Sequence, residues 1–199
     1  MNFGRALLAL LATISAVSAQ AADLTRAEEI VQGKCFVCHG VEGESSSPAF
    51  PRLAGQHAQY IERQLADYKS GKRQSGTMQP MVDDLVAADF AALGAYFESR
   101  KPQAHPVDDA VLAQTGRFIF ERGNPYSGVA ACASCHGAQG QGTATLPRLA
   151  GQHAQYIENQ MKAFDKRERS NDMAVMHAIA VKLTELEVKA VASFISGLQ

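Results

Sequence analysis

The feature that most constrains this chain is a five-residue motif, Cys-x-x-Cys-His, which occurs at residues 35–39 and again at 132–136. All four cysteines of the chain lie in these two copies. Two thiols three residues apart on one helical turn can each add to a vinyl group on the same edge of a porphyrin, and the histidine that follows can then present its imidazole to the iron. The motifs therefore predict two covalently bound haem c groups, held by Cys35, Cys38, Cys132 and Cys135, with His39 and His136 as axial ligands.

Two other uses of paired cysteines explain the pattern less well. A zinc site built from two Cys-x-x-Cys pairs leaves the histidine after each pair without a role. A disulfide within either pair would close a loop of one helical turn and would join nothing distant. Haem attachment accounts for every residue of both motifs.

The N-terminus has the features of a secretory signal peptide over residues 1–21. Arg5 supplies a positive start, residues 6–17 form an apolar run, and small residues lie at 19 and 21. A retained membrane anchor is the alternative, but a run of this length is short for a bilayer. A signal peptide together with c-type haem predicts a bacterial periplasmic protein, with the soluble mature chain beginning at residue 22 and its attachment to the membrane left open.

The chain also contains an internal repeat, because residues 51–62 recur without a change as residues 147–158. Each copy follows its Cys-x-x-Cys-His motif closely, which is typical of a tandem duplication. We therefore predict an N-terminal haem domain over 22–100, a linker over 101–109 and a C-terminal haem domain over 110–199. Pro102 and Pro106 make the linker short and stiff.

The apolar residues recur at three- and four-residue steps in both halves, and no hairpin signal stands out. This pattern predicts an all-α fold. A capping-box pattern places the start of the first helix at Thr25, with Glu28 three residues on. The expected helices are residues 24–38, a helix that opens at 54 or 55 and runs through 68, and residues 87–99, 110–123 and 185–197.

Methionines supply candidates for the sixth position on each iron. A His/Met pair suits electron transfer, whereas an open sixth position suits ligand binding or catalysis. Superposing the final helices of the two copies, at an offset of 98 residues, aligns Met78 with Met176 but leaves Met81 and Met173 without a methionine counterpart. We predict that Met78 and Met176 are the ligands, with Met81 as the alternative to Met78 in the first domain.

Other polar residues of the repeat are candidate partners of the haem. Each proximal imidazole is expected to donate its second N–H to a carbonyl, for which Pro51 and Pro147 are candidates. Capping or solvated roles are favoured for His57 and His153 over iron ligation. The candidate partners of haem propionates, which have ordinary core or surface roles as the alternative, are Tyr60, Tyr156, Arg52 and Arg148.

Taken together, these motifs resemble the cytochrome c4 family of dihaem class I cytochromes c. The resemblance covers the whole mature chain and includes Gly40 and Gly137 after the two motifs, the twice-written Pro-x-Leu-Ala-Gly-Gln, the paired methionines and the closing segment 191–198. It implies two tandem class I cytochrome c domains related by a pseudo-twofold axis. His39 and Met78 would ligate one iron, and His136 and Met176 the other.

The same resemblance implies a periplasmic electron carrier, not an enzyme. Its redox partners would be an upstream quinol-oxidising complex or dehydrogenase and a downstream terminal oxidase. A net charge of −1 gives no basic surface for nucleic acid. The main alternative is the cytochrome subunit of a flavocytochrome c or similar dehydrogenase complex. A haem enzyme or sensor with one open iron is disfavoured by the paired methionines. Residues 124–130 have no counterpart before the first motif, which leaves the choice of partner open.

Overall fold

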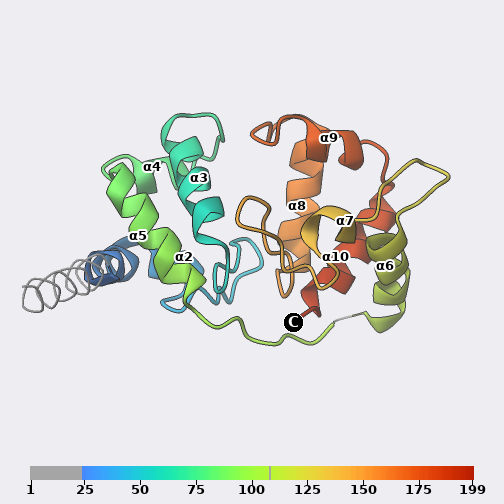
Figure 1. The fold of residues 1–199 in the computed structure, drawn as a ribbon, viewed down its shortest axis with the longest axis horizontal. Helices are drawn as coiled ribbons and strands as arrows, with labels where there is room; N and C mark the ends of the chain where they lie inside the picture. Colours follow the sequence, from blue (N-terminus) through green and yellow to red (C-terminus); the bar gives the residue numbers. More distant parts are fainter. Residues whose placement is uncertain (1–23, 108) are drawn as a thin grey trace, which may run out of the picture.

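The computed structural model describes residues 24–107 and 109–199, and Figure 1 shows two helical lobes joined by an extended segment. The expected signal peptide at residues 1–21 lies outside the described residues. Within them the only β pairing is one isolated bridge between Asn124 and Val129, so the all-α prediction is confirmed.

The N-terminal lobe begins with helical residues 24–30, which continue without a break through η1 (Val31–Cys35) and α2 (Phe36–His39). Thr25 lies inside this helix and not at its start, contrary to the cap expected there. The lobe is completed by α3 (Ala58–Lys69), α4 (Met78–Val82) and α5 (Ala87–Glu98).

The expected start of the second helix at residue 54 or 55 is wrong, because α3 begins at Ala58. Gly55 has a φ of +65°, in the left-handed region, and its N–H donates to the carbonyl of Phe97 at 2.9 Å. The chain therefore turns against the end of α5 before it enters the helix. The same turn precedes α8, where Gly151 has a φ of +72° and donates to the carbonyl of Ile195.

The C-terminal lobe repeats this plan. Its helices are α6 (Ala110–Arg122), α7 (Ala133–His136), α8 (Ala154–Asp165), α9 (Val175–Ala180) and α10 (Glu185–Ser196). Asp109 caps α6 by accepting from the N–H of Leu112 at 2.8 Å. The segment without a counterpart in the first copy forms the loop closed by the Asn124–Val129 bridge, and it carries the fully exposed Tyr126.

Each lobe has its own apolar core. The N-terminal core is formed by buried side chains that include Val31, Leu93 and Tyr96, and the C-terminal core by a smaller set that includes Phe120 and Ile195. In the C-terminal lobe α6 crosses α10 closely at Gly116, where a Cβ would lie 1.8 Å from the carbonyl oxygen of Ala190. Glycine is therefore required at this crossing.

The repeated segment forms the contact between the lobes. The Gln56 side chain accepts from the N–H of Arg148 at 2.8 Å and donates to the carbonyl of the same residue at 2.9 Å. Gln152 makes the same pair of bonds with Arg52, both at 2.9 Å. Each copy of the repeat thus binds the other, and Figure 1 shows the helices that follow, α3 and α8, facing each other. This reciprocal contact gives a physical reason for two identical copies.

Candidate haem sites

In both lobes the Cys-x-x-Cys-His motif lies on a single helical turn, as its spacing predicts. None of the four cysteines takes part in a disulfide, so all four are available for haem attachment. The described residues contain no cluster of three or more His, Cys, Asp or Glu side chains that could hold a metal ion, so the two cysteine pairs do not meet as one zinc site.

The histidine of each motif is buried and oriented by a proline carbonyl. Nδ1 of His39 lies 2.9 Å from the carbonyl oxygen of Pro51, and Nδ1 of His136 lies 3.1 Å from that of Pro147. A carbonyl only accepts hydrogen bonds, so Nδ1 carries the proton and Nε2 keeps a lone pair for a metal. Burial also lowers the pKa of both imidazoles and favours the neutral form that can ligate. The predicted carbonyl partners are confirmed.

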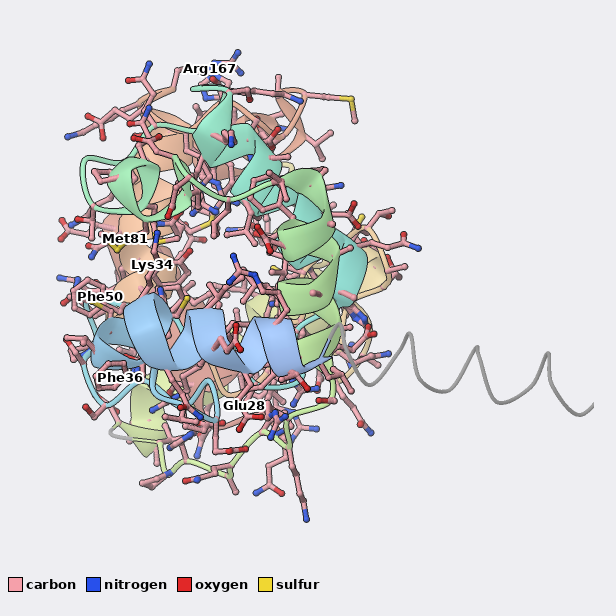
Figure 2. All side chains as sticks on the ribbon, turned by 90° about the vertical axis from the view of Figure 1, so that its left-hand side faces the viewer. Glu28, Lys34, Phe36, Phe50, Met81 and Arg167 are labelled. Carbon is pink, nitrogen blue, oxygen red and sulfur yellow. The ribbon has the colours of Figure 1, made fainter. Side chains whose placement is uncertain are left out.

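The two paired methionines differ in environment from the two unpaired ones. Met78 begins α4, is half-buried, and packs against the N-terminal core together with Cys35. Met176 lies on α9 and is half-buried as well. Met81 is 40% exposed and Met173 is 90% exposed. Figure 2 shows Met81 along the same side of the N-terminal lobe as Phe36 and Phe50.

These donors fit the chemistry of haem c. Each lobe supplies two free thiols, one buried imidazole with Nε2 available, and one half-buried thioether from a separate short helix. The apolar cluster of each lobe includes a motif cysteine and a leucine of the repeat, Leu53 or Leu149, as an apolar porphyrin requires.

The side chains of three of the four candidate propionate partners have a hydrogen-bond partner in the opposite lobe, whereas the Nε of Arg148 is buried without one among the described residues. The hydroxyl of Tyr60 accepts from Arg169 at 3.0 Å, and that of Tyr156 accepts from Arg73 at 3.1 Å. Arg52 donates to the carbonyl of Gly151.

The histidines of the repeat also cross between the lobes. His57 and His153 occupy the N-cap positions of α3 and α8, but neither side chain caps its helix. Their Nε2 atoms instead lie 2.8 Å from the carbonyl oxygens of Gln141 and Ser45, each in the opposite lobe.

Sequence reasoning missed Arg73 and Arg169, which are among the most buried polar residues of the structure. A signal was available, because these two arginines are separated by the same 96 residues that separate the repeated segments. The methionines align at an offset of 98 residues, and at that offset Arg73 and Arg169 do not coincide.

Comparison with known proteins agrees with this geometry. The family model described as Cytochrome c matches twice, at residues 24–101 and 120–199. Cytochrome c4 from Pseudomonas aeruginosa is 38% identical over 96% of this chain and 98% of its own length. The chain belongs to the cytochrome c4 family. The crystal structure of cytochrome c4 from Pseudomonas stutzeri superposes with a TM-score of 0.83 at 36% identity, covering 87% of this chain and 97% of that one.

As a cytochrome c4, the chain carries two covalently bound haem c groups, one in each of its two cytochrome c domains. Its family is one of electron-transfer proteins. Another relative, 36% identical over 82% of this chain and 77% of its own length, is a thiosulfate dehydrogenase electron acceptor from Thiomonas intermedia. In the described part of the chain, no helix is both long enough and apolar enough to cross a membrane.

Proposed function

We propose that this cytochrome c4 is a periplasmic carrier that passes single electrons toward a terminal oxidase, with both irons held by a His/Met pair. Each bound haem takes up and releases one electron. In this proposal the mature chain begins at residue 22, its haem domains span 22–100 and 110–199, and residues 101–109 link them. The haem-attaching and ligating residues are Cys35, Cys38, His39 and Met78 in one domain and Cys132, Cys135, His136 and Met176 in the other.

The observation that carries the proposal is the repetition of one donor set in both lobes. A His/Met pair saturates the iron and raises its reduction potential, which suits an electron carrier. A ligand-binding or catalytic haem would need an open position in at least one lobe. What supports the proposal is that each lobe has a half-buried methionine on a short helix, Met78 on α4 and Met176 on α9.

The residues of the chain fix the electron-transfer geometry. Pro51 and Pro147 orient the imidazoles through their carbonyls, and the two apolar cores keep water from the haems. The reciprocal bonds of Gln56 and Gln152 hold one lobe against the other, so that the distance between the haems is fixed. Outer-sphere transfer requires this kind of positioning and no substrate contact with the iron.

The methionine assignment has a matched test within the chain. Met78→Leu should open the sixth position of the first haem, so that the spectrum of the reduced protein shifts when carbon monoxide is added. Met81→Leu is the control and should leave the protein unreactive toward carbon monoxide. Met176→Leu and Met173→Leu form the same pair in the C-terminal domain. A shift for Met81→Leu in place of Met78→Leu would assign the first iron to Met81.

The carrier role has a separate test. The reduced haem-loaded protein is mixed with membranes that contain a terminal oxidase, under air, and its reduced α-band is followed. Rapid loss of the band that an oxidase inhibitor blocks is the expected result. A band that persists until a second protein is supplied would contradict a freely diffusing carrier.

The second candidate is an electron acceptor bound to a dehydrogenase, of which the flavocytochrome c subunit is one form. The observation that favours it is the relative described as a thiosulfate dehydrogenase electron acceptor. In this case a purified dehydrogenase with its substrate should reduce the haems rapidly and should co-elute with the protein. Reduction without co-elution would leave the dehydrogenase as an upstream donor of the carrier.

A further inference from the structure

Between the two lobes lies a buried polar network centred on Arg73 and Arg169, which we call the arginine cluster. The two arginines are 7% and 9% exposed. They come from equivalent places in the duplication, after α3 and after α8. The other members of the cluster are Tyr60, Gln64, Tyr156, Gln160 and Asn171.

Each arginine of the cluster binds both lobes. Arg73 donates through Nη1 to Gln64 of its own lobe at 2.8 Å, and through Nη2 to Tyr156 and Gln160 of the other lobe at 3.1 and 2.9 Å. Arg169 donates through Nη1 to Gln160 of its own lobe at 2.7 Å. Through Nη2 it donates to Tyr60 and Gln64 of the other lobe at 3.0 and 3.2 Å. Both guanidiniums thus share the same two glutamines.

The positive charge of the cluster exceeds its negative charge. Every acceptor named above is a neutral oxygen, and in the described part of the chain no Asp or Glu oxygen lies within 4.0 Å of either guanidinium. The nearest link to a carboxylate is indirect, because Asn171 donates both to Gln64 and to Asp67, the latter at 2.7 Å. Asp67 also lies 3.7 Å from Lys72, which offsets part of its charge.

The pKa of one tyrosine in the cluster reflects this positive potential. Burial alone would raise the pKa of the Tyr60 phenol, but Arg169 and Arg73 lower that pKa below its ordinary value. Two charges in a buried site also act over longer distances than exposed ones, because little water screens them.

An aromatic side chain connects each guanidinium to the part of its own lobe that carries the proposed methionine ligand. Arg73 stacks over the ring of Tyr68 at 4.7 Å, and Tyr68 packs against the same core as Met78. Arg169 stacks over the ring of Phe164 at 4.6 Å. The carbonyl of Phe164 in turn lies 2.9 Å from Nδ1 of His177, the residue after Met176.

We propose that Arg73 and Arg169 act as one electrostatic unit, shared by the two domains, that raises the reduction potentials of both haems. A nearby positive charge disfavours the oxidised haem, which carries one more positive charge than the reduced haem. Because the two arginines bind the same glutamines between the lobes, neither belongs to one haem alone. This inference rests on the proposed carrier function with two haems. It adds to that function the residues that set the reduction potentials of the haems.

The test replaces the charge and the hydrogen bonds separately. Arg73→Gln removes the charge, whereas Arg73→Lys keeps the charge but loses the forked geometry that reaches Gln64, Tyr156 and Gln160. The midpoint potentials of both haems are measured by spectroelectrochemical titration. Arg73→Gln should lower both potentials, and Arg73→Lys should leave them close to those of the unmodified protein.

The matched control is Arg63→Gln, because Arg63 also lies on the inter-lobe side of α3, 5.4 Å from the ring of Tyr60, but is exposed. Its charge is screened by water, so its removal should shift neither potential. Arg169→Gln and Arg169→Lys repeat the comparison from the other lobe and serve if Arg73→Gln does not fold.

Three results would overturn the proposal. They are equal shifts for the glutamine and lysine variants, no shift for either, or a shift of one haem alone. The carbon monoxide test of Met78 and Met176 does not depend on these outcomes, so failure of the proposed ligand set would be seen separately.

Discussion

At the scale of the residue, the duplication gives the two haem sites the same local chemistry. A proline carbonyl fixes the tautomer of each motif histidine, and a thiol pair lies one turn away. These features depend on neighbours no more than 12 positions from the motif histidine, and so the sequence predicts them well. The arginine cluster depends on partners about a hundred residues away, which no local spacing reveals.

Glu187 provides a residue-scale prediction with a defined pH dependence. Its carboxylate accepts from the N–H of Thr184 at 2.8 Å at the start of α10, and from Asn124 at 2.7 Å. The Thr184 N–H is the main cause of its lowered pKa, with Asn124 adding to it. Glu187→Gln keeps an acceptor for the capping box but removes the negative charge near the start of α10, so we expect it to reduce the free energy of unfolding at pH 7 by about 0.3–1 kcal/mol.

The sign of the pH effect follows from the lowered pKa of Glu187. The stabilisation is fully present above the ordinary glutamate pKa and is lost as the pH falls through the lower pKa of the folded state. Denaturant unfolding of both proteins at pH 7 and at pH 3 measures this difference. The difference in free energy of unfolding between the Glu187→Gln variant and the unmodified protein should be smaller at pH 3 than at pH 7. Glu185→Gln, which removes an exposed partner of Lys189 but no backbone bond, serves as the control. A gap of equal size at both pH values would show that the carboxylate is not responsible.

At the scale of the element, the sequence predicts that the helices exist more reliably than it predicts the residue at which each one begins. The final helices appear where apolar periodicity places them, at α5 and α10. The start of α3 was predicted three or four residues too early. That start is set by Gly55, which turns against the end of α5, and by Gln56, which binds the other lobe. Both causes are tertiary contacts that a pattern within one segment does not contain.

The crossing of α6 and α10 gives an element-scale prediction. A Cβ at Gly116 would lie 1.8 Å from the carbonyl oxygen of Ala190, a backbone atom that cannot move away without shifting α10. We expect Gly116→Ala to lower the free energy of unfolding by about 1–3 kcal/mol or more, despite its better helix propensity. Thermal unfolding of the haem-loaded protein measures the change.

Gly33→Ala is the matched control for this crossing. Gly33 is also helical, but a Cβ there would meet nothing within 4 Å. Its alanine variant should be neutral or slightly more stable, because alanine loses less backbone entropy than glycine. Equal loss of stability in both variants would mean that the close approach of α6 to α10 is not the cause.

At the scale of the whole molecule, the duplication produces an interface in which the two copies of the same segment contact each other. Residues 51–62 and 147–158 are identical and bind each other through the same glutamine and the same arginine backbone. Any change in one copy alters the contact from one side only, so matching sequences are favoured on both sides. The sequence indicated the duplication but not this reason for it, since repeat identity alone does not say which surfaces meet.

Gln56 and Gln152 therefore give a prediction about the coupling of the two domains. Both are buried, and each satisfies one N–H and one carbonyl of the opposite lobe. Replacing either by alanine leaves those backbone groups without a partner, which costs about 1–3 kcal/mol for each buried group left unsatisfied. These hydrogen bonds join the two domains. Their loss should therefore reduce the cooperativity of unfolding between the domains more than the stability of either core.

Calorimetry distinguishes these effects. The unmodified protein should unfold in a transition whose van't Hoff and calorimetric enthalpies approach each other, as for one cooperative unit. In the Gln56→Ala, Gln152→Ala double variant, the transition should separate into two, one for each haem domain. The control is Gln155→Ala, because Gln155 belongs to the same repeat but is exposed, and its side chain donates to Asn159 on its own helix. A single unchanged transition in the double variant would show that other contacts, of which the arginine cluster is the strongest candidate, hold the two domains together.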